Sequence, residues 1–176
     1  MAGIVRNILF VGTAVVGTAC SKLPPLSEIC DGDASLADTT ITGAEHVEGE
    51  VEYADTPPMG GDHNACWTTW TAHTTEVPEE NWVHNLEHGG VVFLYNCPDG
   101  CEEEVTALTA FVADLPTGRG LLTPYAAMAS EFAAVAWEHR LLTRCLDLDA
   151  FQTFFDEHVA QATEDVTADP AAGCTP

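Results

Sequence analysis

The segment from His84 to His88 has the residue types and the spacing of a transition-metal site. His84 and His88 stand four residues apart, Glu87 lies between them, and Gly89 follows directly. Neutral imidazole is the commonest side-chain metal ligand, and two rings four residues apart on a helix can reach one ion. On a strand the same spacing would separate them by about 13 Å. The segment therefore predicts a metal site only if it is helical.

Local signals favour a short helix from Pro78 to His88. Proline suits the first helical position, the acidic pair that follows it suits the first turn, and Gly89 suits the residue after the end. At about 100° per residue, the apolar side chains fall opposite the two histidines and Glu87. We expect the apolar side to pack and the histidine side to face a cleft or water. The alternative is a pair of surface histidines before a strand.

Three further side chains are candidates to complete the site. His63, on a glycine-rich loop, would make a three-histidine set, while Met59 and Met128 could add a thioether. Imidazole and thioether together suit copper, which we favour over zinc, although packing in the core is the alternative for each methionine. Glu87 would orient a ligand rather than bind the ion. His46, in the preceding segment, is not predicted to take part.

Three functions are compatible with this set of residues. The favoured one is a non-enzymatic protein that binds, buffers or delivers a metal ion. His84-x-x-Glu87-His88 also matches a zinc-hydrolase pattern in which glutamate activates water, but Gly89 and Gly90 end the helix at once. In the third, a disulfide-braced binding module, His84, Glu87 and His88 form a hydrogen-bonded cluster without metal.

Residues 1–20 resemble an export signal of a bacterial lipoprotein. Arg6 precedes an apolar run, and Gly17-Thr18-Ala19-Cys20 resembles a cleavage site at which Cys20 would be lipidated. The apolar run is short for a membrane-spanning helix, which needs about 20 residues. We therefore expect a periplasmic or cell-surface protein attached to the membrane by a lipid anchor, with ordinary secretion or an uncleaved anchor as the alternatives. Residues 21–45, rich in small and polar residues, are predicted to be a flexible tether.

The other six cysteines indicate disulfide bonds in an oxidising compartment. Cys97 and Cys101 are expected to close a turn, and Cys30 and Cys174 to tie the two ends together. A zinc site at Cys97 and Cys101 is the rival interpretation, but it lacks a second close cysteine pair. The six are Cys30, Cys66, Cys97, Cys101, Cys145 and Cys174.

The charge of the chain excludes nucleic acids as partners. The 28 acidic residues against 5 basic ones produce a formal net charge of −23. Proteins that bind a phosphate backbone need basic patches, whereas an acidic surface stays solvated and attracts cations.

Residues 46–160 have the length and patterning of one α+β domain. The apolar run 91–95 predicts a buried strand, and periods near 3.6 predict helices over 102–115 and 147–159. Alternation predicts a strand over 47–53, a short strand is expected at 120–123, and 132–142 reads as strand or helix. We expect a two-layer mixed sheet with two main helices on one face, stabilised by disulfides. Residues 161–176 are expected to be an acidic tail, held only if Cys174 is paired.

An ordered set of motifs in this domain resembles domain-of-unknown-function family 3105. The resemblance covers roughly residues 46–160 and implies an exported or membrane-tethered bacterial protein. It also implies that the Gly-x-His loop pairs with the His-x-x-Glu-His element, which here means His63 with His84, Glu87 and His88. Gly61 departs from the serine frequent in the family. The motifs are Tyr53-Ala54-Asp55-Thr56-Pro57-Pro58, Gly61-Asp62-His63, Val83 to Gly89, Val91 to Tyr95, and Leu122-Thr123-Pro124-Tyr125.

Overall fold

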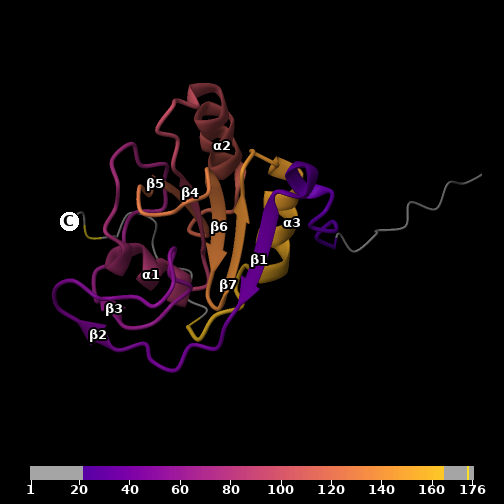
Figure 1. The fold of residues 1–176 in the computed structure, drawn as a ribbon. Coiled ribbons are helices and arrows are strands. Elements are labelled where there is room, and N and C mark those ends of the chain that lie inside the picture. The colour runs from indigo at the N-terminus through magenta and orange to yellow at the C-terminus, as the bar shows by residue number, and fades with distance from the viewer. Residues whose placement is uncertain (1–21, 165–173, 175–176) are drawn as a thin grey trace, which may run out of the picture.

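The computed structural model describes residues 22–164 and Cys174. A mixed five-stranded sheet forms its centre, in the order β1-β7-β6-β4-β5 (Figure 1). Strands β4 and β5 are parallel, and the other neighbours in this sheet are antiparallel. The elements are η1 (Ile29–Gly32), β1 (Ala34–Asp38), β2 (His46–Val47), β3 (His63–Asn64), α1 (Glu79–Glu87), β4 (Val91–Tyr95), α2 (Glu102–Asp114), β5 (Gly120–Pro124), β6 (Phe132–Ala136), β7 (His139–Thr143) and α3 (Leu148–His158).

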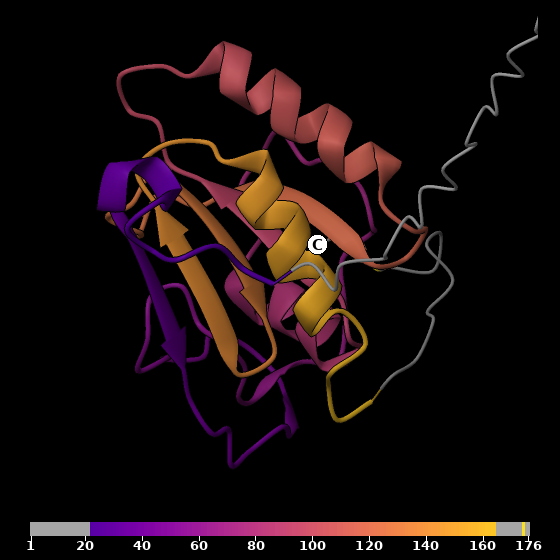
Figure 2. The ribbon, with the colours of Figure 1, turned by 90° about the vertical axis from the view of Figure 1, so that its right-hand side faces the viewer.

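The two faces of the sheet are covered by different helices. Along β4, Val91 and Phe93 point to one face and Val92 and Leu94 to the other, because successive side chains of a strand alternate. Helices α2 and α3 pack on the first face, and Figure 2 shows both on the same side of the sheet. Helix α1 and the loops around it cover the second face. The predicted α+β class, with two long helices on one face, is confirmed.

The elements from residue 78 onward follow the sequence closely. The three helices begin and end within two residues of the predicted positions, and β4 coincides with the apolar run. The ambiguous stretch 132–142 is a hairpin, in which β6 and β7 pair with Ala136 opposite His139. Its two-residue turn requires a left-handed backbone at Glu138, with φ of 68°.

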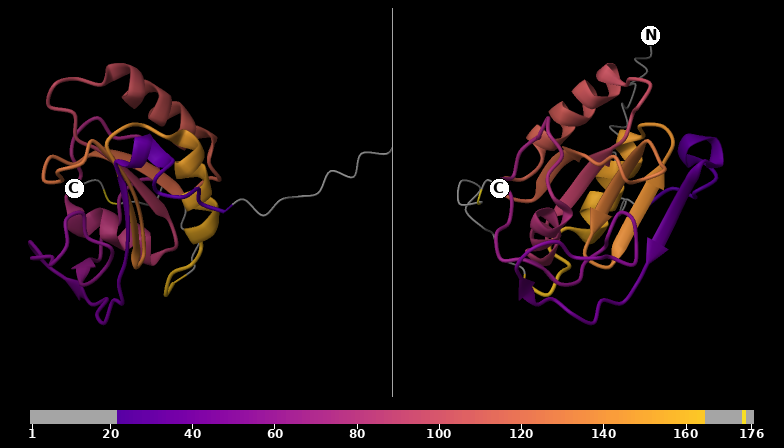
Figure 3. Two further views of the ribbon diagram at one scale, coloured as in Figure 1. Left: turned by 45° about the vertical axis from the view of Figure 1, so that its right-hand side comes forward. Right: turned by 60° about the vertical axis from the view of Figure 1, so that its left-hand side comes forward.

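Two predictions for the N-terminal third are wrong. Residues 21–45 are not simply a tether, because Ala34–Asp38 form β1, which pairs with β7 along the edge of the sheet (Figure 3). The strand expected over 47–53 is reduced to the two residues His46 and Val47, which pair with β3. Sequence alternation missed β1 because an edge strand of mixed burial carries little periodicity of its own, and it predicted too long a strand after His46.

The six cysteines form three disulfide bonds. The predicted Cys97–Cys101 pair is confirmed, which removes the rival zinc interpretation of that turn. Cys30 pairs with Cys145 and not with Cys174, so the predicted closure of the two ends is wrong. Cys174 pairs instead with Cys66.

The expected export signal and the lipidated Cys20 lie outside the described residues. Among the residues that the structure describes, no helix has the length and apolarity to cross a membrane.

Candidate metal centre

Helix α1 carries the His84-Glu87-His88 set, as predicted, but its histidine side is not open. His84 and His88 are only 2% and 6% exposed, and Glu87 is 5% exposed. The helix begins directly after Pro78 and is followed by Gly89, whose φ of 76° ends it. The expected solvent-facing cleft is therefore absent from this side of α1, because the segment 46–70 lies over it.

Two backbone features bring His63 and His46 to α1. Consecutive left-handed residues Gly60 and Gly61, with φ of 136° and 120°, turn the chain immediately before His63. A side chain at Gly60 would press on the ring of Trp137, 3.0 Å away. His63 then pairs in parallel with His46 across the two-residue strands β3 and β2. This pairing places the ring of His46 beside that of His84 on α1, although the two residues are far apart in the sequence.

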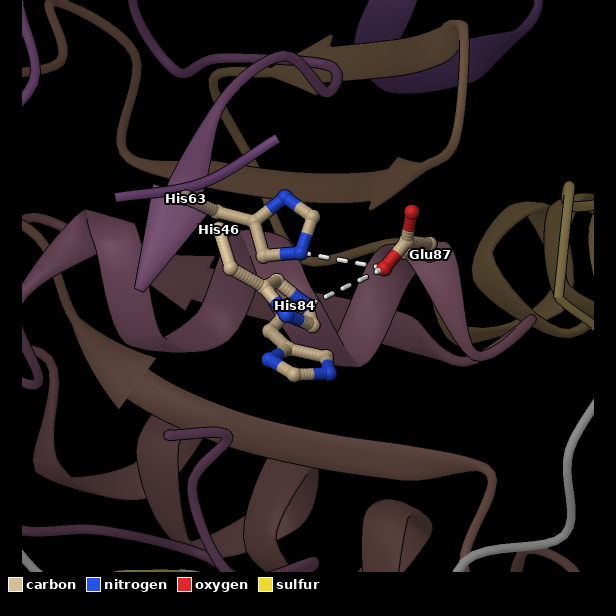
Figure 4. A group of neighbouring side chains, drawn as sticks. All are labelled: His46, His63, His84 and Glu87. Atoms are coloured by element: carbon tan, nitrogen blue, oxygen red, sulfur yellow. Dashed lines mark ion pairs between the residues drawn. The ribbon is translucent and has the colours of Figure 1, made fainter. Parts of the chain in front are cut away.

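The four side chains His46, His63, His84 and Glu87 form one cluster. Each offers a ligand atom, and these four atoms all lie within 4.8 Å of one another. Glu87 Oε2 is 3.0 Å from His63 Nε2 and 3.9 Å from His46 Nε2. Figure 4 shows the imidazole rings gathered beside the carboxylate, tilted or edge-on to one another, with His84 and Glu87 both projecting from α1.

Backbone carbonyls determine which ring nitrogens carry a lone pair. His63 Nδ1 is 2.8 Å from the carbonyl oxygen of Gly61, and His84 Nδ1 is 2.8 Å from that of Asn64. Because a carbonyl only accepts hydrogen bonds, each Nδ1 must be the donor. In the neutral rings the lone pair is then on Nε2, which in His63 faces Glu87 and in His84 faces His88. Metal-binding histidines are oriented in this way by hydrogen bonds from their other nitrogen.

The contact between His63 and Glu87 requires a positive charge between them. The lone pair of the neutral His63 ring would face a carboxylate oxygen at 3.0 Å, in a position where His63 is fully buried. Two unshared electron pairs repel at this distance, so either a proton or a metal ion must lie between them. Metal–nitrogen and metal–oxygen bonds of about 2.0–2.2 Å place neighbouring ligand atoms about 3 Å apart. The observed spacing suits a shared ion.

Burial favours the neutral, metal-binding form of His84 and His88. Desolvation is the main cause that lowers the pKa of His84 to about 4, with the neighbouring histidines adding to it and the hydrogen bond to Asn64 opposing it. The pKa of His88 is lowered for the same main reason. Burial raises the pKa of Glu87, although His63 and His46 oppose the change.

The lowered pKa of His84 predicts a loss of stability in mild acid. The unfolded chain binds the proton near the ordinary value of 6.5, whereas the folded chain resists it until the pH reaches about 4. The free energy of unfolding should therefore fall as the pH falls from about 6.5 and level off near 4. Denaturant unfolding of the chelator-treated protein at several pH values measures this. His84→Gln should show a shallower slope in the same window, and an unchanged slope would contradict the assignment.

An amide clamp holds the covering segment on α1. The side chain of Asn85, fully buried, accepts a hydrogen bond from the backbone N–H of Thr68 and donates one to its carbonyl, at 3.0 and 2.9 Å. Asn81 donates to the carbonyl of Cys66 at 2.6 Å. These bonds place the ring of Trp67 5.3 Å from that of His84 and 5.1 Å from that of His88, so an indole forms one wall of the cluster.

The structure brings together three of the side chains predicted for the site. His63, His84 and Glu87 share the cluster, and Glu87 presents its Oε2 to it directly, 3.0 Å from His63 Nε2. His88 lies beside it, with its Nε2 3.0 Å from that of His84. Gly61 stands where serine is frequent in the family. The difference does not affect the orientation of His63, because the hydrogen bond of His63 Nδ1 goes to the backbone carbonyl of Gly61.

The two methionines lie in the apolar core of the second face. Met59 and Met128 are 3% and 2% exposed and pack in the cluster that contains Trp82 and Leu94. The carbonyl of Met128 accepts a hydrogen bond from Asn96, directly after β4, whereas His88 lies shortly before β4. The strand between them spans about 13 Å. Met128 is thus at the other end of β4 from the histidines, and Met59 is buried in the same apolar cluster.

His46 is the site residue that sequence reasoning missed. It stands in a stretch without periodicity, and only its pairing with His63 reveals its place. In the sequence, only its residue type and its position at the start of the family-like region could have marked His46 as a candidate ligand.

Comparison with known proteins places the chain in a family. The model of a family described as protein of unknown function (DUF3105) matches residues 46–175. The chain belongs to this family. The match begins at His46 and includes the segment 161–175, so the region first expected to be a tail is part of the family's own length. No curated protein and no solved structure matches the chain.

Proposed function

We propose that this DUF3105 protein is an exported, lipid-anchored metal-binding protein whose site consists of His46, His63, His84 and Glu87. The observation that carries the proposal is the convergence of these four ligand atoms within 4.8 Å, two of them on rings whose tautomer is set by backbone carbonyls. Three disulfide bonds suit an oxidising compartment outside the cytoplasm.

Copper(II) is the ion that we expect to bind most tightly, followed by zinc. Three imidazole nitrogens and one carboxylate oxygen form a borderline donor set that suits both ions, and divalent copper binds such sites more strongly than its neighbours in the first transition row. The half-exposed ring of His46 leaves one side of the site open to solvent. An ion that is reachable from solvent can be taken up and released, which suits buffering or delivery.

Metal content of the purified protein tests the proposal. Residues 21–176, exported to the periplasm without a histidine tag, should carry copper or zinc in elemental analysis. His84→Ala should lower the affinity by at least about 100-fold. His46→Ala should also weaken binding, and because its ring is half exposed it removes a ligand without opening a core cavity.

The matched control is His139→Ala, which removes a histidine that pairs with Asp38 and stacks on His158. Its metal content should equal that of the unaltered protein. If the His46 and His139 variants both bind copper and zinc as the original protein does, the proposed site is wrong. Absence of binding altogether, in protein that is folded by circular dichroism, would favour the metal-free binding module.

Glu87→Gln separates the binding protein from the zinc-hydrolase alternative. As a ligand, the carboxylate supplies the only negative charge of the set, so its amide should weaken metal binding. If Glu87 is instead the catalytic base of a hydrolase, Glu87→Gln should leave the metal content nearly unchanged and abolish hydrolysis of peptides or esters. The 3.0 Å approach of its Oε2 to His63 Nε2 supports the role of ligand.

A further inference from the structure

A second group of ligands adjoins the first and shares one residue with it. Glu87, His88 and Glu164 each offer an atom, and these three atoms also lie within 4.8 Å of one another. Building on the proposed function, we propose that the site holds two metal ions, with the carboxylate of Glu87 bridging them. His46, His63 and His84 would bind one ion, and His88 and Glu164 the other.

His88 lies in the position of a ligand. Its side chain is buried, with 6% exposed, and the ring nitrogen that faces His84 and Glu164 is Nε2, whereas its Nδ1 has no hydrogen-bond partner among the described residues. Its Nε2 lies 3.0 Å from that of His84 and 3.8 Å from Glu164 Oε2. Ligands of two neighbouring ions come this close, because ions in paired sites are about 3.5–4 Å apart and share a bridging group.

The backbone fixes Glu164 beside the end of α1. After α3 the chain turns back, and the N–H of Ala160 donates to the carbonyl of Gly89 at 2.8 Å. The N–H of Glu164 then donates to the carbonyl of Glu87 at 3.1 Å. A residue 77 positions after Glu87 is thus held against it by main-chain bonds, and its carboxylate reaches His88 without depending on a flexible side chain alone.

Charge and exposure distinguish the two positions. The first position has the buried imidazoles of His63 and His84, the half-exposed imidazole of His46, and the shared carboxylate of Glu87. The second position has, besides Glu87, the carboxylate of Glu164, whose side chain is 57% exposed. Two divalent ions beside Glu87 and Glu164 are tolerable in a chain of net charge −23. The second ion would keep water among its ligands and exchange faster than the first.

Stoichiometry tests the proposal with Glu164→Gln, a nearly isosteric change on an exposed side chain that does not threaten folding. Titration with zinc, read by calorimetry and by metal content after desalting, should yield two equivalents for the unaltered protein and one for Glu164→Gln. The affinity of the remaining equivalent should change less than about threefold. Glu103→Gln, on the exposed side of α2, removes the same charge elsewhere and should retain two equivalents.

Copper(II) provides an independent readout of proximity. The first equivalent should yield a full electron paramagnetic resonance signal, and the second should broaden or weaken it through coupling between adjacent ions. In Glu164→Gln and in His88→Gln the first signal should persist without that loss. One equivalent in the unaltered protein, or the same stoichiometry in Glu164→Gln, would overturn the two-ion site while leaving the proposed function standing. No bound zinc or copper at all would overturn both.

Discussion

Replacing Cys30 and Cys145 together with serine is expected to lower the free energy of unfolding by about 5 kcal/mol, a value set by the length of chain that the bond closes. The disulfide joins residues 115 positions apart, and it ties η1, before β1, to the end of β7. Without it the unfolded chain regains the entropy of a long loop. Urea unfolding followed by circular dichroism measures the change.

The Cys97–Cys101 pair is the matched control within the same molecule. It joins residues only 4 positions apart, so its removal should cost about 2 kcal/mol by the same relation. Equal losses for the two double variants would show that loop entropy is not the main contribution. In that case local packing around each sulfur pair would explain the stability.

Alanine at Gly90 is expected to destabilise the protein by about 3 kcal/mol, near the upper end for an overpacked site. A Cβ there would overlap the six-membered ring of Trp70 and lie 3.1 Å from the carbonyl oxygen of Asn85. The indole is rigid, so either it leaves its place on the protein or the start of β4 moves. Thermal and denaturant unfolding of Gly90→Ala measure the loss.

A double-mutant cycle with Trp70→Ala identifies the cause. Trp70→Ala has its own cost, but in that background the change at Gly90 should cost less than about 1 kcal/mol, because the overlapping ring is gone. If the cost of Gly90→Ala stays the same in both backgrounds, the indole is not what excludes a side chain there. Gly90 also lies two residues after His88, so both variants should be checked for metal content.

Local patterns predicted the elements wherever one face of a helix or a whole strand is buried. Val91 to Tyr95 form a continuous apolar run, and its first four residues are buried in β4. The turn after α1 needs the left-handed backbone that Gly89 supplies. Asp147 caps α3 by accepting a hydrogen bond from the N–H of Ala150. These signals act over a few residues, so they survive outside the context of the fold.

The sequence failed where a segment depends on a distant partner. β1 exists because β7 offers it an edge, and the covalent bond at Cys30 holds it there. The two-residue strand at His46 is extended because it pairs with the strand at His63. Such pairings produce no periodic pattern of apolar residues in the sequence. The free energy that orders these segments comes from contacts with distant parts of the chain and from disulfide bonds that close long loops.

For the candidate site, local sequence is enough to predict that His84, Glu87 and His88 lie along one side of a short helix, since helical geometry brings residues three and four apart together. It also supplied His63 through the glycine turn before it. The local sequence does not predict that His46 and Glu164 lie beside them or that Glu87 faces His63. Nor does it predict that the carbonyls of Gly61 and Asn64 accept hydrogen bonds from the Nδ1 atoms of His63 and His84. Ligand geometry depends on where separate segments meet, and that is set by the packing of the whole domain rather than by any local repeat.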